Sequence, residues 1–369
     1  MRILIAMDKF KGSLTATQAG EAVARALRPL PCDVCPIADG GEGTAEAMVA
    51  ATGGEWREVK VTDAIGRSAM ARYGMGRDGD AFMEMSAASG LAQVADKPLT
   101  PRAASTYGTG LMMLDAMKRG AKRLVIGIGG SATNEGGMGM AQALGYRFLD
   151  AQGEAVEHLP QDFERVERIE RPLMAMPEVL VASDVDNPLL GELGATRVYG
   201  AQKGVDDMDF FETRLERLAD MVSRDLGVDH RNVPGAGAAG GLGFGLMSFC
   251  NAKLVGGFQL IAAVTDLERR IASSTLVITG EGRVDGQTLF GKGPAGVAAM
   301  ARRHGVPVVA VAGAVEEVQA VRDCFTEAYA IKPEAMALAE AMRRGEELIE
   351  ETVVRHLQRF RELASGHRA

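Results

Sequence analysis

The chain has 369 residues and a formal net charge of −8, from 41 Lys plus Arg against 49 Asp plus Glu. This length predicts two domains, or one large domain with an insertion, and the acidic balance argues against a nucleic-acid-binding protein. Hydrophobic residues make up 47% and charged residues 24%, which excludes a disordered chain and is ordinary for a globular enzyme.

Two apolar segments could suggest a membrane. Residues 1–7 are apolar apart from Arg2, but Asp8, Lys9 and Lys11 follow too soon for the core of a signal peptide. Residues 232–252 carry no charge and are long enough to span a bilayer. That stretch nevertheless holds six glycines and few large apolar side chains, a poor composition for a transmembrane helix. We expect no membrane association and a cytoplasmic protein.

Both ends of the chain alternate strands with helices. The N-terminal elements expected are a strand at 2–6, a helix at 15–27 capped by Ser13, a strand at 33–37, a helix at 42–51 and a strand at 56–61. The C-terminal elements expected are a strand at 275–279, a helix at 295–304, strands at 306–311 and 327–331, and helix from Pro333 onward. Such alternation predicts a parallel sheet covered by helices on both faces.

The middle of the chain has a different texture and holds most of the glycine clusters. The elements expected there are strands at 81–85, 124–128 and 179–182, and helices at 107–119, 208–226 and 257–272. We therefore predict an α/β protein in which both chain ends, 1–62 and 269–369, form a three-layer domain with a parallel sheet. Residues 63–268 are expected to form a second α/β domain inserted into the first. Because clefts between domains commonly hold ligands, we expect the site there.

Glycine is the informative residue: 46 of 369, about 12% against an average of about 7%. One cluster, 127–137, directly follows an expected strand. Gly127, Gly129 and Ala132 fit a loose G-x-G-x-x-G/A dinucleotide pattern, with Asp150 where a ribose-binding acid would stand. Further glycines at 136, 137 and 139 would weaken the following helix, by about 1 kcal/mol each. We favour a phosphate-binding loop, and an NAD-binding turn over 127–150 stays open as the alternative.

A second glycine cluster, 234–243, contains a literal G-x-G-x-x-G. No strand is expected before it, so the context for dinucleotide binding is missing. Glycines at the start of a helix can present free N–H groups to an anion. They can equally allow two helices to approach closely, and the sequence does not choose between these interpretations.

Charged residues recur after the expected strands. They are Asp8 and Lys11 after the first strand; Asp39 and Glu42 after the second; Asp184 and Asp186 after 179–182; and Glu281, Arg283 and Asp285 after 275–279. Two carboxylates on one face, as at 184 and 186, could share a divalent ion; Lys292 is a further candidate phosphate contact. Phosphoryl transfer needs a metal, cations and a carboxylate near the attacking hydroxyl, but no nucleophile triad, and none is evident.

These residues resemble the glycerate kinases of the first bacterial class nearly end to end. The matching blocks are 8–14, 38–44, 126–134, 183–189, 202–204, 234–243, and 280–283 with 287–288. The resemblance implies phosphorylation of D-glycerate with ATP and Mg²⁺, commonly at the 2-hydroxyl to give 2-phosphoglycerate, and two α/β domains, one inserted in the other. Many relatives have Asp where this chain has Glu135, which counts against a metal ligand at that position.

We assign roles beyond the resemblance as hypotheses. Main-chain amides expected to hold the ATP phosphates are those of Gly129, Gly130, Ser131, Thr133, Gly235, Gly237, Gly240 and Gly241. Asp184 is expected to act as base or metal ligand, with Asp186 as a second metal ligand. Lys11 and Arg283 are expected to act in catalysis, and Lys203, Asp39 and Glu281 to bind the substrate. Phosphorylation at the 3-hydroxyl, an NAD-dependent oxidoreductase and a metabolite sensor stay open, as does a homo-oligomer.

Overall fold

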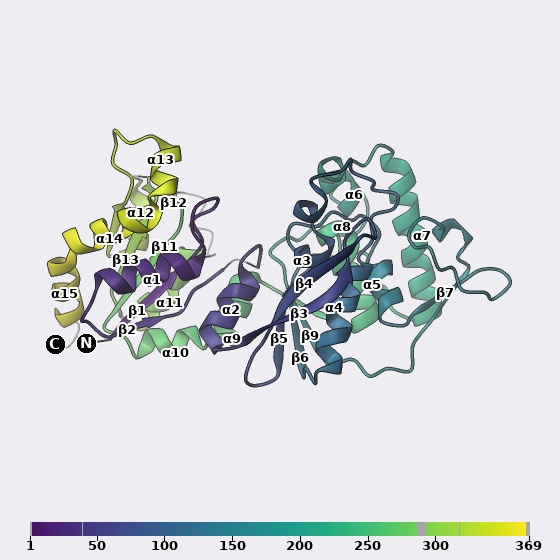
Figure 1. The fold of residues 1–369 in the computed structure, drawn as a ribbon, viewed down its shortest axis with the longest axis horizontal. Helices are drawn as coiled ribbons and strands as arrows, with labels where there is room; N and C mark the ends of the chain where they lie inside the picture. The colour runs from purple at the N-terminus through teal and green to yellow at the C-terminus, as the bar shows by residue number, and fades with distance from the viewer. Residues whose placement is uncertain (1, 39, 286–292, 317, 367–369) are drawn as a thin grey trace. The chain divides into compact units, whose positions relative to one another are not determined.

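The computed structural model describes residues 2–38, 40–285, 293–316 and 318–366 (Figure 1). Asp39 and Lys292 therefore lie outside the described residues. The chain divides into two compact units. The first comprises Met1–Asp39, Glu46–Gly53 and Phe258–Ala369, and the second comprises Gly40–Ala45 and Gly54–Gly257. Both units contain sheets packed with helices, which confirms the predicted α/β class; the domain limits 1–62, 63–268 and 269–369 stay a prediction.

The first unit is built on a five-stranded sheet in the order β15-β13-β11-β1-β2. The strands are β1 (Ile3–Met7), β2 (Cys32–Val34), β11 (Leu276–Gly280), β13 (Val308–Ala312) and β15 (Glu327–Ala330). All neighbours are parallel. Every residue of β1, β11 and β13 is buried, because a parallel sheet is covered on both faces and its central strands are apolar throughout.

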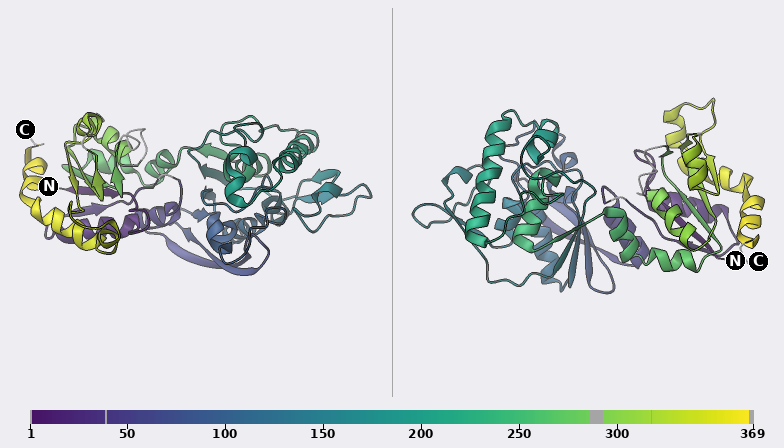
Figure 2. Two further views of the ribbon diagram at one scale, coloured as in Figure 1. Left: turned by 90° about the horizontal axis from the view of Figure 1, so that it is seen from above. Right: turned by 180° about the vertical axis from the view of Figure 1, so that it is seen from behind.

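Helices cover both faces of this sheet (Figure 2). One face packs against α1 (Ala16–Ala26), α13 (Leu338–Arg343), α14 (Gly345–Arg355) and α15 (Leu357–Gly366). The other packs against α9 (Gly257–Val264), α10 (Leu267–Ala272), α11 (Gly293–Arg303) and α12 (Gln319–Cys324). The remaining elements here are α2 (Thr44–Thr52), β12 (Arg283–Val284) and β14 (Ala314–Val315). Ile3, Ile5 and Met7 face the first set, whereas Leu4 and Ala6 face the second, as the two-residue period of a strand requires.

Two details of the first unit differ from the sequence prediction. Thr15, not Ser13, caps α1, because Thr15 and Gln18 bond each other's main chain as a capping box. The Ser13 hydroxyl instead donates to the Met342 carbonyl at 2.6 Å. The helix predicted over 257–272 is two helices, α9 and α10, separated at Asp266, which has the left-handed φ of +53°.

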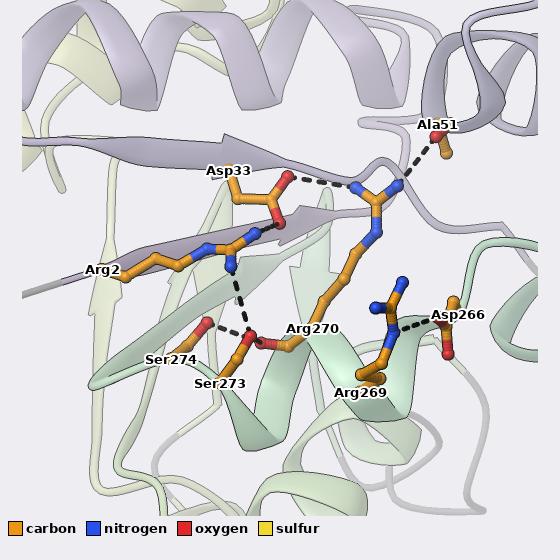
Figure 3. Close-up of polar contacts among 8 residues, drawn as sticks. All are labelled: Arg2, Asp33, Ala51, Asp266, Arg269, Arg270, Ser273 and Ser274. Atoms are coloured by element: carbon orange, nitrogen blue, oxygen red, sulfur yellow. Dashed lines mark hydrogen bonds and ion pairs between the residues drawn. The ribbon is translucent and has the colours of Figure 1, made fainter.

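An ion-pair network fixes the edge of this sheet where the strands begin (Figure 3). Asp33 on β2 accepts from Arg2 at 2.9 Å and from Arg270 at 3.0 Å. Arg270 also donates to the Ala51 carbonyl at 2.9 Å. One carboxylate thus joins the start of β1 to α10, and the second arginine joins α10 to the end of α2. The opposite edge, where the strands end, carries the loops rich in charged residues.

The second unit is built on a six-stranded mixed sheet in the order β10-β9-β6-β5-β4-β3. The strands are β3 (Glu55–Thr62), β4 (Ser68–Met75), β5 (Asp80–Glu84), β6 (Arg123–Gly127), β9 (Glu178–Ala182) and β10 (Lys253–Val255). β5, β6, β9 and β10 are parallel, whereas β3, β4 and β5 pair antiparallel. The strand expected at 56–61 thus forms a hairpin with β4 rather than continuing the N-terminal sheet.

The helices of the second unit and a small hairpin complete it. The α-helices are α3 (Ser86–Ser89), α4 (Tyr107–Lys118), α5 (Met138–Ala143), α6 (Ala195–Tyr199), α7 (Met208–Leu226) and α8 (Ala238–Cys250); short 3₁₀ turns are η1 (Leu91–Val94), η2 (Phe163–Arg165) and η3 (Ala201–Lys203). β7 (Arg147–Leu149) pairs antiparallel with β8 (Arg168–Glu170). α8 lies within the uncharged stretch 232–252 and is almost wholly buried. Within the described residues, no helix has the length and apolarity needed to cross a membrane.

Candidate active site

In the first unit, the strand order marks one edge of the sheet as a ligand site. β1 and β11 are neighbours, the chain proceeds to β2 on one side of them, and β13 and β15 lie on the other. Successive strands are thus added in opposite directions from the β1–β11 pair. In open α/β sheets, ligands bind beyond the carboxyl ends of strands at such a switch point. The loops that leave this point begin at Asp8 and at Glu281.

The two loops at this switch point lie side by side. The Asp8 amide donates to the Gly280 carbonyl at 2.8 Å, and a Cβ added to Gly282 would lie 3.5 Å from the Lys11 amide nitrogen. Asp8 is only 6% exposed, and its carboxylate accepts from the Lys9 amide at 2.6 Å. The switch point therefore holds a buried carboxylate whose loop is fixed by main-chain contacts.

Two of the predicted catalytic cations are at this edge with their side chains outward. Lys11 is exposed. Arg283 has a side chain that is 68% exposed and forms an ion pair of 3.1 Å with Asp285. Glu281 is half-buried, and its carbonyl accepts from the Gly313 amide at 3.0 Å. Lys11, Glu281 and Arg283 are thus gathered on one sheet edge, and cations of this kind suit an anionic substrate.

The second unit has its own cluster of loops where its parallel strands end. Glu84, the last residue of β5, accepts through one carboxylate oxygen from the amides of Gly43 at 2.9 Å and Ala45 at 3.1 Å. Asp184, just after β9, accepts from the Gly257 amide at 3.0 Å. Side chains at the strand ends therefore fasten the neighbouring glycine-rich main chain. Glu84 was not predicted from the sequence; its place at the end of an apolar strand was the available signal.

The loop that follows β6 presents main-chain donors. Gly129 and Gly130 are exposed, whereas Ser131 is 6% and Thr133 is 1% exposed. Within the described residues, the amides of Gly129, Gly130, Ser131 and Thr133 donate no hydrogen bond. Two other main-chain hydrogen bonds hold the loop. The Ala132 amide donates to the Ser89 carbonyl at 3.0 Å, and the Leu91 amide donates to the Gly130 carbonyl at 2.9 Å. Unpaired donors on a fixed loop are the arrangement that an anion requires.

Glu135, in the same loop, is a buried structural carboxylate. It is 1% exposed and accepts from the Thr106 hydroxyl and from the Gly139 amide, both at 2.6 Å. Burial raises the pKa of Glu135 to about 7, although these hydrogen bonds oppose the rise. One carboxylate oxygen thus bonds an amide at the start of α5 directly, and the other bonds the Thr106 hydroxyl. Thr106, which sequence analysis missed, links this carboxylate to the Met140 amide at 2.8 Å.

The second glycine cluster packs against this loop. A Cβ on Gly240 would lie 1.9 Å from the Thr133 carbonyl oxygen, and one on Gly241 would lie 2.9 Å from the Gly136 Cα. The Gly237 amide donates to the Asn187 carbonyl and the Gly241 amide to the Gly237 carbonyl. Close main-chain packing explains these glycines, and the phosphate role predicted for Gly237 and Gly241 is not supported, because their donors are used. Gly235 is buried as well, and a Cβ added there would lie 2.5 Å from the Cδ2 atom of Leu254.

Lys203 is buried beside the same loop. It is 2% exposed, and its ammonium donates to the Thr133 carbonyl at 2.7 Å. Burial lowers the pKa of Lys203 to about 7. The side chain that sequence analysis assigned to substrate thus contacts the main chain of the protein in this structure.

The residues predicted to bind metal are less enclosed. Asp184 is half-buried and Asp186 is exposed. Over the described ranges, no three His, Cys, Asp or Glu side chains are grouped so that they could hold a metal by themselves. Mg²⁺ is usually held by one or two carboxylates together with phosphate oxygens and waters. A carboxylate oxygen donor at a strand end, as at Asp184, fits that mode of binding.

The structure argues against the dinucleotide alternative. A Rossmann turn requires the strand after the helix to lie parallel in the same sheet. β7 instead pairs antiparallel with β8 in a separate two-stranded sheet. The Asp150 carboxylate accepts from the amides of Gln152 and Glu154, at 2.9 and 3.0 Å, and so caps a local turn.

The fold and these loops define an α/β protein with glycine-rich and charged loops at its strand ends, and comparisons with known proteins name the family. A model of the glycerate kinase family matches residues 3–361. The chain is 42% identical over 362 residues to a glycerate kinase of Halalkalibacterium halodurans, with 95% of each chain covered. It is 42% identical over 328 residues to the glycerate 2-kinase of Escherichia coli, with 86% of each covered. A crystal structure of a putative glycerate kinase 2 from Salmonella typhimurium LT2 matches all of both chains, with a TM-score of 0.88 and 37% identity.

The chain belongs to the glycerate kinase family. The resemblance found in the sequence is therefore confirmed. The protein is an enzyme, a kinase that transfers a phosphoryl group to an alcohol, with ATP as co-substrate and a small molecule as acceptor. This membership, together with the pairing of β7, replaces the oxidoreductase alternative.

Proposed function

We propose that this chain phosphorylates D-glycerate with ATP and Mg²⁺ at the 2-hydroxyl, giving 2-phosphoglycerate and ADP. The position is supported by the relative from Escherichia coli, which is named a glycerate 2-kinase. The observation that carries the proposal is the loop after β6, where the amides of Gly129, Gly130, Ser131 and Thr133 have no acceptor within the described residues.

In this proposal those amides hold the phosphates of ATP. Peptide N–H groups offer directed positive charge without the desolvation cost of an ion, and the loop needs little rearrangement because Ala132 and Gly130 are already bonded to neighbouring main chain. Glycine at 129 and 130 lets the phosphate approach the backbone closely. The second glycine cluster then acts by packing against this loop.

Asp184 and Asp186 are the candidate carboxylates that would hold Mg²⁺, which would supply positive charge to offset that of the phosphates. Asp184, which is the less exposed of the two and is oriented by the Gly257 amide, is also the candidate to accept the proton of the attacking hydroxyl. A carboxylate suits that task because a carboxylate held within hydrogen-bond distance of the hydroxyl can take its proton as the oxygen attacks.

Lys11 and Arg283 are the candidate cations for the anionic groups. The guanidinium of Arg283 can bond both oxygens of the D-glycerate carboxylate, in exchange for its ion pair with Asp285. Lys11 would stabilise the charge of the transferred phosphoryl group. Glu281 can accept a hydrogen bond from a substrate hydroxyl. Asp39, which was also predicted to bind the substrate, lies outside the described residues.

A coupled assay tests the proposal directly. Purified protein is given ATP, Mg²⁺ and D-glycerate, and ADP release is followed; L-glycerate serves as the matched control. The product is then examined by phosphorus NMR. A phosphate on C2 couples to one proton and gives a doublet, whereas a phosphate on C3 couples to two protons and gives a triplet. A triplet would reject the 2-hydroxyl, and absence of ADP release would reject the substrate.

A further inference from the structure

Lys203 is an unusually placed cation. It ends the short turn η3, and Gly204, with φ of +77°, redirects the chain after it. Its side chain is 2% exposed, and within the described residues its ammonium has one hydrogen-bond partner, the Thr133 carbonyl at 2.7 Å. An ammonium has three donors and is costly to remove from water. A buried lysine with a single main-chain acceptor therefore requires an explanation beyond packing.

The carbonyl that Lys203 holds belongs to the phosphate-binding loop of the proposed function. Thr133 is the last of the four loop residues, with Gly129, Gly130 and Ser131, whose amides the proposed function assigns to the phosphates. Gly240 crowds the same carbonyl from another segment, because a Cβ there would be 1.9 Å away. The Thr133 peptide is thus confined between the backbone at Gly240 and the ammonium of Lys203, and its plane sets the direction of the loop that precedes it.

A second contact joins the same two segments. Asn134 donates from its side-chain amide to the Thr196 hydroxyl at 2.9 Å. Thr196 lies on α6, which leads through Gly200 into η3 and Lys203. Two consecutive loop residues are therefore anchored to one short segment, 196–203. The Thr133 hydroxyl and the Asn134 side-chain oxygen are both buried without a hydrogen-bond partner among the described residues, so this junction contains more polar groups than its own contacts use.

We propose that Lys203 is a positioning residue that fixes the Thr133 peptide and thereby orients the amides of Gly129, Gly130, Ser131 and Thr133 toward the phosphates of ATP. The inference rests on the proposed function and differs from the earlier expectation that Lys203 binds the acceptor substrate. The ammonium also adds positive charge next to a loop that must take an anion. Lys203 thus acts on ATP through the loop and does not touch D-glycerate.

Substitution of Lys203 by methionine separates these two roles. Lys203→Met keeps the length and removes the charge, and the expected result is a fall of about 100-fold in kcat/KM for ATP, because small misplacements of binding groups are expensive. The KM for D-glycerate should stay within about twofold of the wild type, since uniform substrate binding is untouched. Lys203→Arg should not restore activity, because a planar fork does not fit a single confined carbonyl. Lys118→Met, an exposed site on α4, is the matched control.

Two readouts do not depend on catalysis. Hydrogen exchange of the peptide spanning 128–137 should be faster in Lys203→Met than in the wild type or in Lys118→Met, without nucleotide. Binding of a non-hydrolysable ATP analogue, measured by calorimetry, should weaken in parallel. In Lys203→Ala, added ethylammonium should partly recover nucleotide binding, because it replaces the missing ammonium in the space left behind; tetramethylammonium, which has no N–H donor, should not.

The proposal is overturned by either of two results. The first is a large rise in the KM for D-glycerate with unchanged nucleotide binding, which would make Lys203 a substrate ligand. The second is unchanged exchange over 128–137 in a folded variant. If Lys203→Met and Lys203→Ala do not fold, Lys203→Gln, which keeps a donor, carries the same measurements. If the wild type fails to phosphorylate glycerate, the proposed function fails alone, because exchange and nucleotide binding still test the role of Lys203.

Discussion

Glu135 provides a quantitative test of how the loop after β6 is held. The side chain is 1% exposed, and burial raises its pKa from 4.5 to about 7. Between these values the folded protein binds a proton that the unfolded chain does not. The stability supplied by the protonated carboxyl is therefore complete below about pH 4.5 and is lost as the pH rises through about 7. At about 1.4 kcal/mol for each pKa unit, the loss amounts to about 3 kcal/mol.

The perturbation that isolates this effect is Glu135→Gln. Glutamine has the same shape, does not titrate, and can still pair with Thr106 and Gly139 through its amide. Between about pH 5 and about pH 8.5, the free energy of unfolding of the wild type should fall by about 3 kcal/mol relative to this variant. The lowered pKa of Lys203 makes the free energy of unfolding rise with pH above about pH 7. Lys203 is present in both proteins, so its contribution cancels when the two are compared.

Urea denaturation followed by tryptophan fluorescence is the appropriate assay. Trp56 is the single tryptophan of the chain, and it lies on β3 of the second unit, which also contains Glu135. Glu157→Gln, at an exposed position, is the control and should show the pH dependence of the wild type. If the wild type and Glu135→Gln differ by the same amount at both pH values, the argument from burial is wrong.

Three further predictions concern the site. Asp184→Asn should lower kcat by about 100-fold or more if Asp184 is the base, and a loss that excess Mg²⁺ reverses would make it a metal ligand instead. Lys11→Ala should lose most activity while its circular dichroism and melting temperature stay unchanged, because the side chain is exposed; normal kinetics would remove Lys11 from the mechanism. Gly240→Ala should lower stability by about 3 kcal/mol, from overpacking against Thr133 and a strained φ. Gly153→Ala, at a φ of +82° with open space around it, should cost only about 1 kcal/mol, and equal costs would contradict the packing argument.

Much of the fold could be predicted from local patterns. The strands expected at 124–128 and 179–182 are β6 and β9, and the helix expected at 208–226 is α7 with the same limits. These predictions succeed because a buried strand and a two-faced helix each leave a period in the sequence that does not depend on the partner. The capping of α1 was placed at the wrong hydroxyl, because Ser13 and Thr15 are both good caps and the choice depends on which one Met342 engages.

Which strands pair with each other was harder to predict from the sequence. The strand at 56–61 was grouped with the N-terminal sheet from its position in the chain, whereas its partner is β4, in a hairpin of the second unit. Likewise the two glycine clusters looked like separate anion sites. Only the folded chain shows that Gly240 and Gly241 pack against Thr133 and Gly136, since a glycine needed for close packing and one needed for a ligand are identical in sequence.

By itself, the sequence determined the α/β class, the order of most elements and the blocks that identify the glycerate kinase family, because these depend on local periodicity and on residue type. The tertiary structure decided what each polar residue faces. Glu135 accepts a hydrogen bond from the amide of Gly139 on α5, and Glu84 accepts one from the amide of Gly43. Lys203 donates to a main-chain carbonyl. Burial and partner fix the charge and task of such groups, and both arise from segments far apart in the chain, which no local pattern records.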